Sequence, residues 1–185
     1  VGLPGSSGDI TLPAEKEVAA RFLDELDRFV SREIEPQAAR LKSLIQQNNN
    51  NYKYINKLGV LYARYGMFEE AEAQFERVLD TEEDYLPALV NLGNIAFLKE
   101  EMERAVTFYK RASSMDPYND TVLLNLAKTY HELERYGEAE RTYGILKSSN
   151  PELAERFAYL ELANSSAGRA DETGSAREVM IWEEE

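Results

Sequence analysis

The sequence predicts an all-α protein, an α-solenoid of three repeated helix pairs with an N-terminal helical extension and a C-terminal capping helix. Two observations predict this fold. Small, aromatic and apolar residues recur with a period of 34 residues through the middle of the chain. Short polar segments also interrupt the helical pattern between these recurrences. A fixed period of this length is typical of repeat proteins, in which each unit buries its apolar face on its neighbours.

The repeat is defined by three sets of equivalent residues, each spaced 34 apart. They are Leu58-Gly59, Leu92-Gly93 and Leu126-Ala127; Ala71, Ala105 and Ala139; and Phe75, Tyr109 and Tyr143. We expect the small residue of the first helix and the alanine of the second to let the two helices approach closely. The aromatic residue four positions after that alanine lies one turn along the same face and fills the gap before the next unit.

From Tyr52 to Pro151 this pattern resembles the tetratricopeptide repeat (TPR) family. Pro117 and Pro151 end the second and third units, as the family's prolines do, because proline cannot continue a helix. The tryptophan common near the start of the family's motif is replaced by Ile55, Leu89 and Leu123. The resemblance implies three TPR units within residues 50–151, over 52–85, 86–119 and 120–153 in motif register.

The N-terminal flank is predicted to hold a linker at residues 1–12 and a helical extension at residues 13–49. An apolar stripe follows one face of the extension, and Pro36 should kink or divide its helix. The stripe either packs on the first repeat unit or serves as a dimerisation or partner helix, which would make a homodimer through the N-terminal helices. The stripe consists of Val18, Phe22, Leu26, Phe29 and Val30.

The C-terminal flank is predicted to hold a capping helix at residues 152–167 and an acidic tail at residues 168–185. A polar outer face on such a helix would stop further stacking. The tail ends in VMIWEEE, whose four apolar residues need burial. We expect them to pack on the body of the protein; the alternatives are the groove of a neighbouring molecule or an interface within a larger chain.

The composition argues against catalysis. His131 is the only histidine, cysteine is absent, and no glycine-rich phosphate loop or GxSxG motif occurs. We therefore expect no enzyme, no catalytic residue, no cofactor and no metal site. A net charge of −13 disfavours nucleic acid as a partner. No membrane insertion, transmembrane segment or signal peptide is predicted within these residues, and we expect a soluble protein of unknown compartment.

The TPR resemblance implies a concave groove lined by the first helices. Asn91 and Asn125 take the same place in consecutive units, and an amide can pair with both the N–H and the C=O of a bound peptide backbone. The alternative is that these amides satisfy neighbouring backbone or water. Several cations give the groove a basic character that would suit an acidic segment. The predicted peptide-binding groove consists of Lys53, Lys57, Arg64, Asn91, Asn94, Phe97, Asn125, Lys128 and His131.

The carboxylate clamp of the chaperone-binding TPR proteins is disfavoured, because only Asn91 matches its five positions. The other four hold Asn56, Val60, Thr121 and Asn125. We therefore predict a non-catalytic adaptor that binds a peptide or helix of a partner protein in the groove. The alternative is a structural spacer or assembly module of a larger protein, with contacts made by the N-terminal helices or the convex face. A module that recruits substrate to a catalytic domain elsewhere in a longer chain is a third reading.

Overall fold

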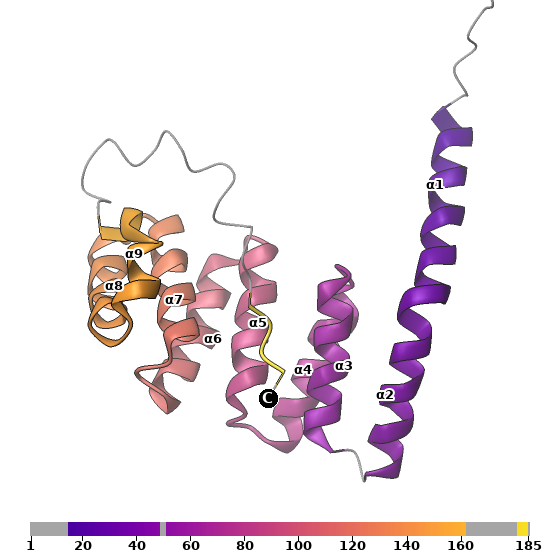
Figure 1. Cartoon of the computed structure of the whole chain (residues 1–185), viewed down its shortest axis with the longest axis horizontal. Helices are drawn as coiled ribbons and strands as arrows, with labels where there is room; N and C mark the ends of the chain where they lie inside the picture. Colours follow the sequence, from indigo (N-terminus) through magenta and orange to yellow (C-terminus); the bar gives the residue numbers. More distant parts are fainter. Residues whose placement is uncertain (1–14, 49–50, 162–180, 185) are drawn as a thin grey trace, which may run out of the picture. The chain divides into compact units, whose positions relative to one another are not determined.

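The computed structural model describes residues 15–48, 51–161 and 181–184, and every regular element within these residues is helical. The chain divides into two compact units, residues 1–39 and 40–185. The first unit contains α1 (Glu15–Phe29), a π-helical turn η1 (Val30–Ile34) and the beginning of α2 (Glu35–Gln47). The rest of α2 and all later elements belong to the second unit (Figure 1).

The π-helical turn accounts for the break predicted at Pro36. Pro36 has no N–H and cannot make the α-helical bond to the carbonyl of Arg32. The helix changes register just before it, where the N–H of Glu35 bonds to the carbonyl of Val30. On α1 the apolar stripe is exposed, including Phe22 at 65% and Leu26 at 46%. Whether this stripe packs on the repeats or binds a partner stays a prediction.

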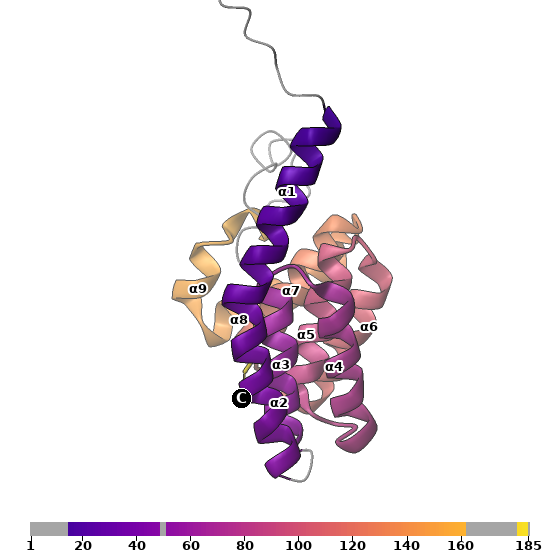
Figure 2. The ribbon, with the colours of Figure 1, turned by 90° about the vertical axis from the view of Figure 1, so that its right-hand side faces the viewer.

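The second unit is built from three antiparallel helix pairs. These are α3 (Tyr52–Arg64) with α4 (Phe68–Thr81), α5 (Leu86–Leu98) with α6 (Met102–Met115), and α7 (Asp120–Glu132) with α8 (Tyr136–Ser149). Each second helix also packs on the first helix of the next pair, and α5 contacts both α3 and α7. Figures 1 and 2 show the pairs stacked one after another. The predicted α-solenoid is therefore confirmed.

Each pair closes tightly because a small residue on its first helix faces an aromatic ring on its second. A Cβ added to Gly59 would lie 2.5 Å from Cε1 of Phe75, and a Cβ at Gly93 would overlap the ring of Tyr109 in the same way. The rings of Phe75 and Tyr109 are fully buried. The structure thus confirms the role predicted for the small residues of the first two units.

The turn inside each pair contains a residue in the left-handed conformation, which the sequence did not predict. Gly66, Glu100 and Glu134 occupy equivalent places and have φ values of 74°, 62° and 58°. A left-handed conformation costs glycine little but disfavours glutamate by roughly 1–2 kcal/mol. Only the first unit has glycine at this place, so the repeat signal there was weak.

Charged side chains join neighbouring pairs. Glu72 on α4 accepts a hydrogen bond from Nζ of Lys99 at 3.1 Å and forms an ion pair with Arg104 on α6. Partial burial acts to raise the pKa of Glu72, but hydrogen bonds from Arg104 and Lys99 together lower it. Arg135, at the start of α8, pairs with Glu103 of α6 at 2.9 Å. These contacts help to hold the pairs in register.

Within the described residues the C-terminal cap, predicted as a single helix over residues 152–167, is divided into two short elements. It consists of α9 (Pro151–Glu155) and a 3-10 helix η2 (Ala158–Glu161), and residues 162–167 lie outside the described residues. Its buried residues are Ala154, Phe157 and Leu160, three apart in sequence. Ala154 lies in α9, Phe157 in the turn between the two elements, and Leu160 in the 3-10 helix.

Two glycine substitutions should have opposite effects on stability. Gly93→Ala forces a methyl group into the ring of Tyr109, and we expect the free energy of unfolding to fall by about 1–2 kcal/mol. At Gly144 on α8 an added methyl group would have no atom within 4 Å, and the higher helix propensity of alanine should raise the free energy of unfolding by about 0.5–1 kcal/mol. Urea unfolding followed by circular dichroism measures both. An equal gain for the two variants would contradict the close packing at Gly93.

Candidate peptide-binding face

The first helices of the three pairs, α3, α5 and α7, present a common face that we call the first-helix face. It is defined by Asn56 on α3, Asn91 and Asn94 on α5, and Asn125 on α7. All four amides are buried, with at most 2% of each residue exposed. Asn91 and Asn94 are three residues apart and so lie on the same side of α5. Local capping fixes where two of these helices begin, because Asn51 and Asn119 accept hydrogen bonds from the first-turn N–H groups of Lys53 and Val122.

The described end of the C-terminal tail, residues 181–184, lies against this face without regular secondary structure. Asn91 holds the main chain of Glu183 from both sides. Its Nδ2 donates to the carbonyl of Glu183 at 2.8 Å, and its Oδ1 accepts the N–H of Glu183 at 2.9 Å. Figure 1 shows the segment, in yellow, lying along α5. One amide side chain therefore recognises both polar groups of a single peptide residue.

Two further asparagines extend this contact. Nδ2 of Asn56 donates to the carbonyl of Glu183 at 2.8 Å, and Nδ2 of Asn94 donates to the carbonyl of Ile181 at 2.9 Å. In an extended chain the polar groups of residues i and i+2 point to the same side, which explains why Ile181 and Glu183 are engaged together. All four bonds go to main-chain atoms, so the contact depends little on the side chains of the bound segment.

The amides are fixed in place by hydrogen bonds among themselves. Nδ2 of Asn91 also donates to Oδ1 of Asn56 at 3.2 Å. Oδ1 of Asn94 accepts from the hydroxyl of Tyr109 at 2.7 Å and from Nδ2 of Asn125 at 2.9 Å. With its oxygen occupied, Asn94 must present its Nδ2 to the tail. Burial raises the pKa of Tyr109 well above its ordinary value, which keeps this hydroxyl protonated as a donor.

Of the predicted basic residues of the first unit, Arg64 contacts the tail. Arg64, at the end of α3, forms an ion pair with the Glu184 carboxylate. Both side chains remain substantially exposed, at 55% and 40%, so the pair contributes little to affinity. Lys53 is exposed and Lys57 is half-buried on the same helix. The main-chain bonds to the asparagines therefore dominate the contact.

The remaining predicted site residues form a separate cluster towards the C-terminal cap. Nζ of Lys128 lies 5.8 Å from the ring centroid of Phe97 and 5.9 Å from that of Phe157. Burial lowers the pKa of Lys128, and the nearby Glu132 opposes this effect. The ring of His131 packs edge-on against Tyr136 and Tyr159, each at 5.6 Å. The structure therefore does not gather all nine predicted residues at one place.

Two outcomes differ from the sequence-based picture. Asn56 contacts the tail but was not among the predicted site residues. Asn125 was predicted to act like Asn91, yet its amide bonds to Asn94 and lies one step behind the tail contact. Of the apolar residues at the end of the tail, Val179 and Met180 lie outside the described residues. Ile181–Glu184 lie on the body of the protein through main-chain bonds, while Ile181 remains 48% exposed.

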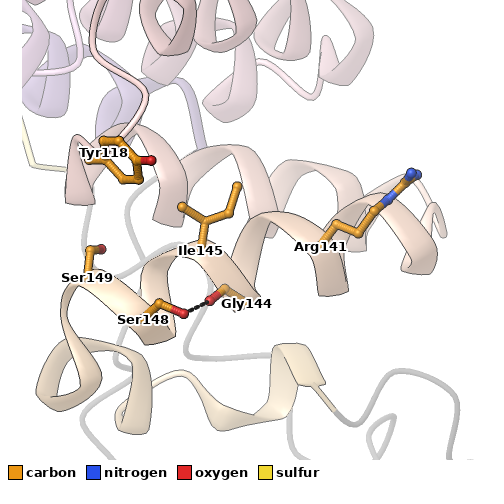
Figure 3. A pocket seen from close by; sticks show the side chains of 6 residues that line it. All are labelled: Tyr118, Arg141, Gly144, Ile145, Ser148 and Ser149. Carbon is orange, nitrogen blue, oxygen red and sulfur yellow. Dashed lines mark hydrogen bonds between the residues drawn. The ribbon is translucent and has the colours of Figure 1, made fainter.

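A surface hollow of about 400 Å³ lies between α8 and the loop before α7 (Figure 3). Its lining contains no carboxylate and no histidine, and Oγ of Ser148 is already bonded to the carbonyl of Gly144 at 2.9 Å. It offers no acid–base pair for catalysis. The hollow is lined by Tyr118, Arg141, Gly144, Ile145, Ser148 and Ser149.

The described part of the chain contains no cluster of three or more histidine or acidic side chains that could hold a metal ion. Among the described helices, none has the length and apolar character needed to cross a membrane.

Comparison with known proteins identifies the repeats. The family model described as tetratricopeptide repeat matches residues 96–162. Over these residues the chain consists of tetratricopeptide repeats, and the relatives and solved structures below support a TPR protein. Proteins of this family are generally non-catalytic scaffolds that mediate protein–protein interactions.

Relatives of this TPR protein include the BBSome complex member BBS4 of Bos taurus, 28% identical over 104 residues, and tetratricopeptide repeat protein 8 of Mus musculus, 27% identical over 95 residues. These alignments cover 56% and 51% of the chain but only 20% and 18% of the relatives. The chain therefore spans about a fifth of the length of these two proteins. A third relative, the uncharacterised protein ycf37 of Cyanophora paradoxa, is 26% identical over 117 residues, covering 61% of the chain and 68% of the relative.

Solved structures support the same fold. A TPR protein from Parabacteroides merdae superposes with a TM-score of 0.62 at 21% identity, covering 78% of this chain and 56% of that one. MamA superposes with a TM-score of 0.57 at 19% identity, covering 68% and 79%. At this identity the likeness concerns the fold alone.

The burial of Tyr109 predicts a pH dependence of stability. Its pKa is raised above the ordinary 10.0 in the folded state, so its contribution is complete below about pH 10 and is lost as the pH rises through the folded-state value. Tyr109→Phe should cost about 1 kcal/mol near neutral pH, through loss of the bond to Asn94. This deficit should shrink towards about pH 11, because the variant has no phenol to ionise.

Urea unfolding at a series of pH values tests this expectation. Tyr118→Phe, at an exposed ring, is the matched control for loss of one tyrosine hydroxyl. A Tyr109→Phe deficit that stays constant across the series would show that the buried hydroxyl does not couple to folding as described.

Proposed function

We propose that this TPR protein is a non-catalytic adaptor that binds an extended segment of a partner protein on the first-helix face. The observation that carries the proposal is the pairing of Asn91 with both main-chain groups of Glu183. A side chain that satisfies the N–H and the C=O of one residue is suited to a peptide backbone in an extended conformation, whatever its side chains.

The surroundings of Asn91 support the same function. Its amide, with those of Asn56 and Asn94, is oriented by other buried groups before any ligand arrives, so little order has to be created on binding. Arg64 favours a carboxylate on the residue after the one that Asn91 holds, as Glu184 follows Glu183. Lys53 and Lys57, on the same helix, add to the attraction of an acidic segment. The partner class is therefore a protein segment that is extended and acidic.

The predicted cluster around Lys128 has a separate part in this proposal. The cation lies between aromatic rings from α5 and the C-terminal cap, an arrangement that ties the cap to the array. Phe97, Lys128 and His131 would then support the end of the binding face, and Asn125 would orient Asn94. The segment itself would contact Asn56, Arg64, Asn91 and Asn94.

One observation favours the alternative function, a structural spacer or assembly module. The apolar stripe of α1 is exposed, with Val18 at 51% and Phe22 at 65%. Such a stripe suits another helix, including that of a second copy. One relative is, by its name, a member of a complex. In this alternative the first-helix face has no partner to bind.

The adaptor and spacer functions are distinguished by peptide display on the purified full chain. Calorimetry then measures the affinity of the selected peptides. The comparison is made in chains that carry Glu183→Pro, so that residues 181–184 of the chain itself do not occupy Asn91. Under the adaptor proposal, adding Asn91→Ala to this background should weaken binding by roughly 10- to 100-fold, since two hydrogen bonds of about 0.5–1.5 kcal/mol each are lost. Lys110→Ala, at an exposed position of α6, is the matched control and should leave affinity unchanged. Thermal unfolding checks that each variant is folded.

Selected peptides that bind the Glu183→Pro chain equally well with and without Asn91→Ala would refute the proposal. A selection that recovers no peptide would favour the spacer alternative, and mutation of the α1 stripe should then abolish assembly with its partner.

A further inference from the structure

The segment on the first-helix face belongs to the same chain, and this has a consequence for binding. Residues 181–184 occupy the side-chain amides of Asn56, Asn91 and Asn94, which a partner segment would need for its own main-chain hydrogen bonds. A partner and the tail cannot occupy Asn91 together, because both hydrogens of its Nδ2 and its Oδ1 are engaged. The two segments must therefore compete.

We propose that the C-terminal segment Ile181–Glu184 is an intramolecular competitor that covers the first-helix face until a partner segment of the same chemistry displaces it. This inference rests on the proposed function. It adds to that function a description of the ligand: an extended stretch with a carboxylate placed to reach Arg64, as in Ile-Trp-Glu-Glu.

The length of the connecting chain allows the contact to form within one molecule. Residues 162–180 separate the cap from the bound segment, and nineteen residues reach at most roughly 65 Å. The cap and α3 are separated by three steps along the row of first helices, or about 30 Å at 8–10 Å per packed helix. A tether of this length gives the tail an effective concentration on the order of millimolar. Even a weak contact would then keep the face largely covered.

Because Asn91 binds the main chain of the tail, a proline substitution in the tail tests the contact specifically. Glu183→Pro removes the N–H that Oδ1 of Asn91 accepts, and places a ring where the hydrogen lay. Glu183→Ala removes the carboxylate and leaves every main-chain bond in place. Both changes lie in the tail and leave the helix pairs untouched, so loss of folding of the repeats does not confuse the comparison.

The probe is a fluorescein-labelled synthetic peptide with the sequence of residues 179–185, blocked at both ends. Its affinity for the full chain is measured by fluorescence polarisation. The apparent affinity of a covered site is reduced by the fraction of time that it is free. We expect Glu183→Pro to bind the probe at least about tenfold more tightly than wild type, and Glu183→Ala to stay close to wild type. Adding Asn91→Ala to Glu183→Pro should abolish this gain.

Three results would overturn the proposal: equal affinity of wild type and Glu183→Pro, no binding by either, or the same gain for Glu183→Ala as for Glu183→Pro. Sedimentation equilibrium supplies a fourth. A wild-type dimer that Glu183→Pro dissociates would place the tail on a second copy. These results would refute the competitor role of the tail without refuting the adaptor function. Display-selected peptides that need Asn91 could still bind a chain whose own tail does not compete.

Discussion

The contact between Gly93 and the ring of Tyr109 joins the repeat core to the binding face. Without a side chain at Gly93, the ring of Tyr109 can lie directly on α5. In that position its hydroxyl reaches Oδ1 of Asn94, the residue next to Gly93. The amide of Asn94 is thereby turned so that its Nδ2 faces the tail. The close packing of Tyr109 on Gly93 therefore also orients the amide of Asn94 for binding the tail.

The equivalent aromatic residues show how one repeated position serves different ends. Phe75 fills the first pair with an apolar ring and has no hydroxyl to offer. Tyr109 bonds to Asn94 on the first-helix face. Tyr143 donates to the carbonyl of Ala154 at 2.8 Å and so anchors the C-terminal cap. The shared ring maintains the solenoid, and the hydroxyls of Tyr109 and Tyr143 give the second and third units connections that the first unit lacks.

The sequence predicted the solenoid well because the fold is local and repeated. Each pair depends on contacts within 34 residues, and three equivalent copies of the same small and aromatic residues exposed the register. The helices α3, α5 and α7 begin at Tyr52, Leu86 and Asp120, the first places of the motif units. The cap was less predictable, because its three-residue spacing of buried side chains occurs only once. The left-handed turn residues were missed because Glu100 and Glu134 carry no sequence signal for that conformation.

The binding face was predictable only in part. Asn91 lies in a recurrent groove position, and the double pairing of its amide with a peptide was inferred from amide chemistry alone. Asn56 escaped because Val90 and Leu124 occupy its place in the other units, so no repetition marks it. Asn56 and Asn91 both bond to Glu183, which lies 127 and 92 residues away in the sequence. The repeat pattern does not predict where this tail residue binds. Asn125 shares the register of Asn91 but not its role, because the described tail residues bond to α3 and α5.

Trp182 is the only tryptophan of the chain and lies between the two residues whose main chains are bonded. Acrylamide quenching of its fluorescence in the full chain therefore tests most directly whether Asn91 holds an extended backbone on this face. With Lys110→Ala as the control, Asn91→Ala should increase the quenching constant and shift the emission to the red as the tail leaves the face. An emission spectrum and quenching constant identical to those of wild type would contradict the account.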